Sequence, residues 1–285
     1  MMKRMSSPRK KKRIFGACIM GFLVAFFYAP ILYMIIYSFN DSRSLTKFSG
    51  FSLQWYEKMF NDSTMMESLF YTIASAVLAT VISTFVGTIT AIGLSKSKRF
   101  LKNLVEQINQ IPIMNPEIVT AIGLLMFFSM LGVKKGFTTM LLAHVMFCIP
   151  YVMLSVMPKL RSLDPNLADA ALDLGATPWQ ALTKVIVPQI MPGIISGALV
   201  AFTMSFDDFI ISYFVTGNGV NNISILVYTM SKRVNPSINA LSTLIIGIIT
   251  IVLVIVNVIP MLKDWSEKKA KEKAREAEKT ETAIK

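Results

Sequence analysis

Apolar residues fall into six long runs that are separated by short polar stretches, which is typical of a chain that crosses a membrane repeatedly. A helix needs about 20 predominantly apolar residues to cross the hydrocarbon core of a bilayer. The runs are close to this length or longer. We therefore expect an all-α integral membrane protein with six transmembrane helices at Ile14–Phe39, Leu69–Leu94, Ile111–Leu131, Phe137–Met157, Met191–Val215 and Leu241–Leu262.

The composition agrees with this class of protein. Hydrophobic residues make up 53% of the 285 residues and charged residues only 16%, with a mean hydropathy of +0.55. A soluble domain usually carries about a quarter charged residues. The first apolar run follows a basic stretch like that of a signal peptide, but it exceeds the roughly 7–15 residues of a signal core and no small-residue cleavage site follows. We interpret it as a retained first span.

The distribution of Lys and Arg predicts the orientation. Most of the 29 basic residues lie in both termini and in the loops after the second and fourth spans. Because positive charge stays in the cytoplasm, both termini are expected inside. The domain organisation is then a basic cytoplasmic tail at 1–13, a six-span domain at 14–262 with a cytoplasmic loop at 158–190, and a charged cytoplasmic tail at 263–285. Beside a span, a basic tail binds anionic membrane lipid more simply than nucleic acid, which is not an expected partner.

The sequence contains no recognised signature of catalysis, although intramembrane enzymes can use sparse acids. It has no GxxxxGK followed by Ser or Thr, no HExxH and no GxSxG. Cys18, Cys148 and the single His144 all lie inside apolar runs. A lone histidine there is expected to pack or to hydrogen-bond between helices. No catalytic residue, cofactor site or metal site is therefore predicted on this chain.

The polar loop after the fourth span has the pattern of two short helices. Asp164–Pro165 begins the first, and Thr177–Pro178 begins the second, because each pair combines a capping side chain with a proline that needs no N–H partner. Gly175 stands between them, where a chain leaving a helix often needs positive φ. The second helix is expected to stop at Pro188. An apolar stripe on this pair suits either a hairpin lying on lipid or a helix that docks into a groove of another protein.

The same loop resembles the EAA loop of ABC importer permeases. Asp169-Ala170-Ala171, Gly175 and Val185-x-Val187-Pro188 match the family's Glu-Ala-Ala, Gly and Ile-x-Leu-Pro at the family's spacing, with conservative replacements. The resemblance implies a type I permease architecture in which this loop contacts two copies of a separate ATP-binding subunit. That partner would hold ATP and Mg, and this chain would hold no cofactor. The implied coupling residues are Asp169, Ala170, Ala171, Gly175 and Pro188.

Three further strings resemble one branch of that family, over most of Ile14–Leu262. They are "QWYEKMF", "LSKSKRFLKNL" and "LVAFTMSFDDFIISYFVTG". They are similar to the spermidine/putrescine importers, and to the permease subunit that pairs with a longer sister permease. The resemblance implies polyamine import across the bacterial inner membrane with a sister permease and an extracytoplasmic polyamine-binding protein or lobe. The alternatives are a permease for an iron, thiamine or phosphonate compound, and a membrane scaffold or signalling protein that moves no solute.

Acidic residues at membrane depth are costly, so they mark candidate positions for the solute pathway. On a continuous fifth span, Asp207 and Asp208 would lie about sixteen residues, or roughly 24 Å, along the helix. One would face the pathway and the other would pair with a helix or with the sister subunit. Glu117 follows Pro116, which favours a kink. A polyamine needs carboxylates for its ammonium groups and aromatic faces along its length. The candidate pathway residues are Asp207, Asp208, Glu117, Phe206, Phe209 and Tyr213.

Two alternatives to this assignment stay open. The acids could only tie helices together or bind a basic residue of a partner. A divalent cation also prefers carboxylates, but few other oxygen ligands stand nearby in the sequence to form a cage. Asn115 and Asn221–Asn222 are weaker candidates that turns and helix caps explain.

Overall fold

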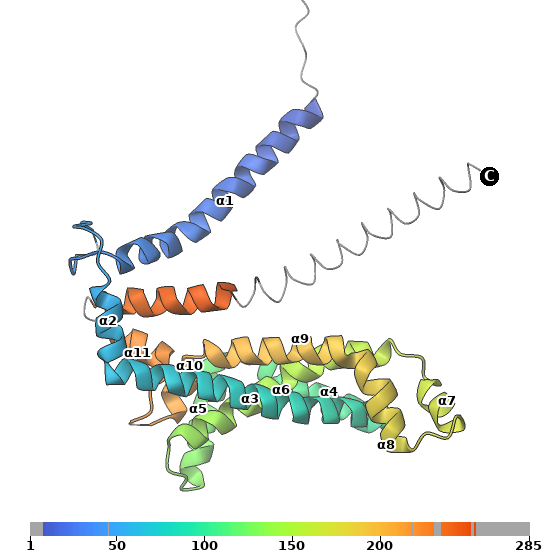
Figure 1. Cartoon of the computed structure of the whole chain (residues 1–285). Coiled ribbons are helices and arrows are strands. Elements are labelled where there is room, and N and C mark those ends of the chain that lie inside the picture. Colours follow the sequence, from blue (N-terminus) through green and yellow to red (C-terminus); the bar gives the residue numbers. More distant parts are fainter. Residues whose placement is uncertain (1–7, 45, 218, 231–234, 252–253, 255–285) are drawn as a thin grey trace, which may run out of the picture. The chain divides into compact units, whose positions relative to one another are not determined.

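The computed structural model describes residues 8–44, 46–217, 219–230, 235–251 and 254, and the described part is almost entirely helical (Figure 1). The chain divides into two compact units, residues 1–61 with 233–285, and residues 62–232. Part of the predicted basic tail, the second half of the predicted sixth span and the predicted charged tail at 263–285 lie outside the described residues.

The first unit begins with α1 (Pro8–Ser38), whose apolar part Phe15–Ser38 confirms the first predicted span. A short loop leads to α2 (Gln54–Asn61), where the Trp55 indole N–H donates a hydrogen bond of 2.6 Å to the main-chain oxygen of Asn40. The same unit contains an apolar helix at Ser237–Ile251, where the sixth span is predicted to begin.

The second unit is built around three long helices that pack against one another. α3 (Ser63–Ser95), α6 (Phe137–Arg161) and α9 (Val187–Phe206) run side by side (Figure 1). α3 and α6 confirm the predicted second and fourth spans. The shared core is apolar and is fully buried at, among others, Ala91, Met140, Cys148, Val152, Val156, Ile190 and Ala201.

Glycines allow the three helices to approach closely. A Cβ added at Gly87 of α3 would lie 2.9 Å from the Cβ of Val152 on α6. At Gly197 of α9, an added Cβ would lie 3.1 Å from the Cα of the same valine. Within membranes, small residues at helix contacts replace the hydrophobic driving force with close van der Waals packing. Val152 is therefore a point of α6 at which both neighbouring helices approach closely.

The third predicted span is bent. α4 (Arg99–Met114) and α5 (Glu117–Met130) meet at an angle of 106°, so the expected helix Ile111–Leu131 is wrong as a single element. Asn115 adopts an extended conformation (φ −78°, ψ 143°) because a proline disfavours the helical region for the residue before it. The kink expected at Pro116 is thus a sharp bend between the two helices, the α4–α5 elbow. The described residues contain four helices long and apolar enough to cross a membrane, or five if this bent pair counts as one.

The fifth predicted span also differs from the expectation. The helix that opens with α8 (Pro178–Gln180) continues through a wide π-helical turn, Ala181–Ile186, into α9 without a break. The predicted stop at Pro188 is therefore wrong. The wide turn precedes Pro188, which lies at the start of α9 where a missing N–H is tolerated.

The continuous helix expected at Met191–Val215 is wrong as well. α9 ends at Phe206, Asp207 forms its C-cap, and the short α10 (Ile210–Val215) begins three residues later. α11 (Ile223–Met230) follows and completes the unit. α10 and α11 lie at one end of the three-helix bundle, and α8 and the preceding loop helix lie at the other end (Figure 1).

Candidate functional site

The loop after α6 contains one short helix and leads into a second helix whose start is capped. The Asp164 carboxylate accepts from the Asn166 N–H at 2.9 Å, and the first helix, α7, covers only Leu167–Asp173. The helix therefore begins later than the start predicted at Asp164–Pro165. The Thr177 hydroxyl oxygen accepts from the Gln180 N–H, while the Gln180 side chain accepts from the Thr177 N–H at 2.9 Å. This reciprocal cap confirms the predicted start of the second helix.

Gly175 closes the first helix with the predicted left-handed turn, at φ +84°. Its N–H donates to the Leu172 oxygen at 2.9 Å, and the Ala176 N–H donates to the Ala171 oxygen at 3.1 Å. These two bonds form a Schellman motif, which satisfies the last carbonyls of α7 and requires a positive φ at the glycine. No other atom lies within 4 Å of a Cβ added at Gly175, so the backbone conformation alone disfavours other residues there.

The loop presents apolar side chains to solvent on either side of this turn. Leu174 is 90% exposed and Trp179 is 71% exposed. Asp169, Ala170 and Pro188 are exposed, and Ala171 is half-buried. Behind the loop, a groove of about 450 Å³ separates α7 from the ends of α3 and α6, and Lys96, Leu160, Asp164 and Leu172 are among its lining residues. The protruding leucine and tryptophan suit a partner surface better than water.

A second cavity lies where the α4–α5 elbow faces the break between α9 and α10. Its volume is about 370 Å³. It brings together four of the predicted pathway residues, which are Glu117, Asp207, Asp208 and Phe209. The residues that complete its wall are Pro112, Thr120, Phe147, Tyr151, Met204, Ile210 and Ile211.

Phe206 and Tyr213 are not among the described residues that line this cavity. The Phe206 ring stacks on Phe202, with centroids 5.6 Å apart. The Tyr213 ring lies 5.5 Å from the Phe209 ring and 6.0 Å from the Tyr228 ring. Tyr213 therefore packs against the cavity residue Phe209, whereas the half-buried Phe206 packs along α9 against Phe202.

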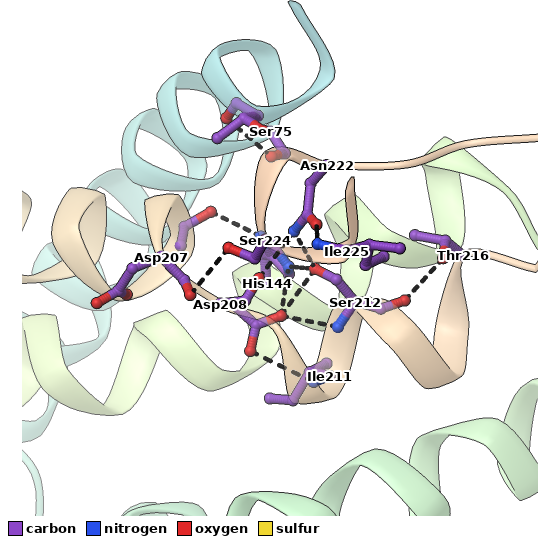
Figure 2. A network of polar contacts seen from close by, with 12 residues as sticks. Ser75, His144, Asp207, Asp208, Ile211, Ser212, Thr216, Asn222, Ser224 and Ile225 are labelled. Carbon is purple, nitrogen blue, oxygen red and sulfur yellow. Dashed lines mark hydrogen bonds and ion pairs between the residues drawn. The ribbon is translucent and has the colours of Figure 1, made fainter. Parts of the chain in front are cut away.

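The two adjacent acids lie in different surroundings. Asp208 is 8% exposed, and its carboxylate accepts from the Ser212 N–H and the Ser212 hydroxyl, both at 2.7 Å, and from the Ile211 N–H at 3.3 Å (Figure 2). Asp207 is exposed at the cavity, and its main-chain oxygen accepts from the Ser224 hydroxyl at 3.3 Å. Among the described residues, no neighbouring side chain donates to the Asp207 carboxylate. Of the two adjacent acids, Asp207 therefore has the carboxylate that is more available to a solute.

His144 connects this network to α6. Its Nε2 lies 2.9 Å from the Ser212 hydroxyl and 3.3 Å from the Asp208 carboxylate, and its Nδ1 lies 2.6 Å from the Ser205 hydroxyl. The side chain is fully buried, which confirms that the lone histidine packs and hydrogen-bonds between helices. Within the described residues, no group of three or more His, Cys, Asp or Glu side chains is placed to hold a metal ion.

Asn222 acts as a cap, as expected for that position. Its side-chain oxygen accepts from the Ile225 N–H at 2.9 Å at the start of α11, and its amide donates to the main-chain oxygen of Asp208 at 2.8 Å. The sequence-based reasoning missed Tyr151, Ser205 and Ser212. The two serines are seven residues apart within an apolar stretch, which is a periodic polar signal, whereas the position of Tyr151 depends on how α6 packs.

The chain is similar to proteins of one well-defined family. Residues 83–271 match the family described as binding-protein-dependent transport system inner membrane component. The chain is 39% identical to the putrescine transport system permease protein PotI of Escherichia coli (strain K12), over 82% of this chain and 85% of that protein. It is 36% identical to the spermidine/putrescine transport system permease protein PotC of Haemophilus influenzae, over 82% of this chain and 91% of that protein.

The fold is similar to one seen by crystallography. The chain matches a chain of a bacterial ABC transporter involved in the import of the acidic polysaccharide alginate, with a TM-score of 0.66. The match covers 89% of this chain and 97% of that chain, at 17% sequence identity. At this identity, the match supports the helical arrangement alone.

Proposed function

The chain belongs to the family of binding-protein-dependent transport system inner membrane components, and from this premise we propose that it is the permease subunit of an ATP-driven polyamine importer. A permease component is not itself the ATPase. The protein is a multi-pass protein of the inner membrane. The proposed solute is spermidine or putrescine, and this chain forms the pathway together with a sister permease.

The observation that carries the proposal is the cavity shared by Asp207 and Glu117. A linear polyamine is a chain of methylene groups with ammonium groups, so it needs separated carboxylates and aromatic surface between them. The cavity offers two exposed acids from different helices, Asp207 at the end of α9 and Glu117 at the start of α5. The rings of Tyr151 and Phe209 line the same space. This arrangement favours a cationic solute over an anionic phosphonate, which the two acids would repel.

The proposed architecture has six spans with both termini in the cytoplasm. The four long helices, the bent pair α4–α5 and the apolar helix at Ser237–Ile251 provide for six crossings. The excess of Lys and Arg in the termini and in the loops after the second and fourth spans supports this orientation. Residues 158–190 then face the cytoplasm.

We propose that the exposed turn of this loop docks on an ATP-binding subunit, of which the complete transporter has two copies. Leu174 and Trp179 supply apolar side chains of the kind that become buried at the centre of an interface. Asp169, Ala170, Ala171, Gly175 and Pro188 are the proposed coupling residues around it. ATP and Mg belong to that partner. An extracytoplasmic polyamine-binding protein delivers the solute at the opposite mouth.

Uptake of labelled spermidine and putrescine by cells with and without this chain tests the proposal. Asp207→Asn and Glu117→Gln are expected to reduce uptake at equal amounts of protein in the membrane. Glu57→Gln is the matched control, because Glu57 is an exposed acid on α2 that does not line the cavity. Loss of iron, thiamine or phosphonate uptake with polyamine uptake unchanged would identify a permease for another solute. No change in any uptake would favour a scaffold or signalling role.

A further inference from the structure

Five polar side chains form one buried cluster where the bundle meets α10 and α11. Each comes from a different part of the second unit: Thr72 from α3, His144 from α6, Ser205 from α9, Ser212 from α10 and Asn222 from the segment before α11. Thr72 joins the cluster through the main-chain N–H of Ile223, which donates to its hydroxyl at 2.8 Å. Figure 2 shows His144, Ser212 and Asn222 gathered around Asp208 at the break between α9 and α10. All five are at most 1% exposed.

The hydrogen positions in this cluster follow from the donors that each group has. A serine hydroxyl has one hydrogen, and the hydroxyl of Ser212 donates it to the Asp208 carboxylate. The Ser212 oxygen is then an acceptor for both His144 Nε2 at 2.9 Å and Asn222 Nδ2 at 3.0 Å. His144 therefore carries hydrogen on Nε2. In the neutral imidazole, Nδ1 is then free to accept from the hydroxyl of Ser205 at 2.6 Å.

This assignment makes His144 the link between two sides of the helix break. Ser205 lies in the last turn of α9, just before the break, and Ser212 lies in the first turns of α10, just after it. One imidazole ring bonds both. A buried carboxylate is costly unless hydrogen bonds satisfy it. The interior position of Asp208 therefore depends on the donors of Ile211, Ser212 and His144.

We propose that His144 is a positioning residue that, through Ser205 and Ser212, keeps the Asp208 carboxylate inside the protein and thereby directs the neighbouring Asp207 carboxylate into the cavity. The inference rests on the proposed function for its meaning in transport, but not for its geometry. Without the imidazole, the Asp208 carboxylate loses its contact with Nε2 and the Ser212 hydroxyl loses its fixed position, so the carboxylate turns toward the cavity. The short segment Asp207–Phe209 then rotates, and Asp207 leaves the cavity that it shares with Glu117.

A chemical readout of the position of Asp207 tests this directly. Asp207→Cys is introduced in a Cys18→Ser chain, and the assembled transporter in membranes is treated with a cationic thiosulfonate reagent. Labelling of this chain is followed by its mass. His144→Phe is expected to slow labelling of the introduced cysteine about tenfold, the fold-change that corresponds to about 1.4 kcal/mol. The matched control is Glu57→Cys on α2, an exposed position that does not line the cavity and whose labelling rate His144→Phe leaves unchanged.

Two further chains make this readout specific. The Cys18→Ser chain with His144→Phe, but without the introduced cysteine, measures any reaction of the buried Cys148 and is subtracted. His144→Gln is the conservative variant, because its amide N–H reaches toward the position of Nε2 and keeps a donor to Ser212. It is expected to retain labelling within about twofold of the parent chain.

Uptake kinetics supply the second test. At equal amounts of protein in the membrane, His144→Phe is expected to raise the spermidine concentration for half-maximal uptake about tenfold. If His144 acts through Asp208, the double variant with His144→Phe and Asp208→Asn is expected to lose no more uptake than the more impaired of the two single variants. Additive losses would overturn the proposal, since the two residues would then act independently.

The outcomes separate this inference from the proposed function. Unchanged labelling of the introduced cysteine in the His144→Phe chain overturns the positioning role, whatever solute is carried. Slowed labelling in a transporter that carries no polyamine supports the positioning role and rejects the polyamine assignment. Equal slowing at the Asp207→Cys and Glu57→Cys positions would show an effect that is not specific to Asp207 and would also overturn the positioning role.

Discussion

Asp207 and Asp208 are neighbours in the chain, yet one carboxylate faces a cavity and the other is enclosed by hydrogen-bond donors. Asp208 accepts three hydrogen bonds from Ile211 and Ser212, whereas no neighbouring side chain among the described residues donates to the carboxylate of Asp207. The break between α9 and α10 makes this possible, because successive residues there do not follow the regular rotation of a helix.

This difference predicts opposite consequences for the two conservative substitutions. Asp208→Asn removes the charge to which the donors of Ser212 and His144 are directed, so we expect it to destabilise the folded protein by about 1–3 kcal/mol. Asp207→Asn removes an exposed charge and is expected to leave stability unchanged. Thermal unfolding of the purified transporter in detergent compares them. Equal midpoints for both variants would contradict the distinct roles.

Two glycines on α3 provide a matched test of helix packing. Gly87→Ala places a Cβ 2.9 Å from the side chain of Val152, so we expect destabilisation of about 1–3 kcal/mol from overpacking. Gly93→Ala meets no atom within 4 Å, and the better helix propensity of alanine is expected to stabilise it by up to about 1 kcal/mol. Unfolding midpoints in detergent should shift in opposite directions. Similar shifts at both sites would argue against close contact of α3 with α6.

The turn at Gly175 predicts an order of substitutions that depends on backbone conformation alone. Asn tolerates positive φ, whereas a β-branched residue does so poorly. Because the space around the added Cβ is open, Gly175→Asn is expected to keep most of the binding to the ATP-binding subunit, and Gly175→Val to lose more. Co-purification of that subunit with the tagged chain measures this. Equal retention by both variants would show that the left-handed turn is dispensable for docking.

The ion pair between Arg161 at the end of α6 and Glu106 on α4 has a length of 2.7 Å, but both side chains are partly exposed. Exposed pairs contribute about 0.2–1 kcal/mol, and salt screens them. Glu106→Gln is therefore expected to lower the unfolding midpoint slightly at low salt and not at high salt. The exchange Glu106→Arg with Arg161→Glu should restore the midpoint. A large loss that salt does not alter would assign Glu106 another role.

The helices themselves were largely predictable, because long apolar runs and capping residues are local signals. The runs at Ile14–Phe39, Leu69–Leu94 and Phe137–Met157 became α1, α3 and α6 with small changes at the ends. The predicted left-handed turn at Gly175 and the cap at Thr177 were confirmed for the same reason.

The breaks were harder to predict, since they depend on partners that are distant in the sequence. Apolar residues continue on both sides of Asp207 and Asp208, so the run Met191–Val215 was predicted as one helix, although α9 ends at Phe206. The break is stabilised by His144, which lies 61 residues before Ser205. Pro188 was expected to end a helix, but the wide turn before it allows the helix to continue.

The candidate site was predictable in its acids and less so in its walls. Asp207, Glu117 and Phe209 do line one cavity, because costly acids inside apolar runs are a strong sequence signal. Tyr151 joins them only through the packing of α6, and Phe206 and Tyr213 face elsewhere. Which of two adjacent acids is available depends on hydrogen bonds that no local pattern encodes.

The unbroken helix Pro178–Phe206 places the tryptophan of the loop and the acid of the cavity at the two ends of one piece of backbone. Its 29 residues correspond to a length of about 43 Å at 1.5 Å per residue. A displacement or rotation of Trp179 is therefore transmitted toward Asp207 along a helix, without passing through any loop. The wide turn at Ala181–Ile186 and the prolines Pro188 and Pro192 are the places along this helix where such motion is absorbed.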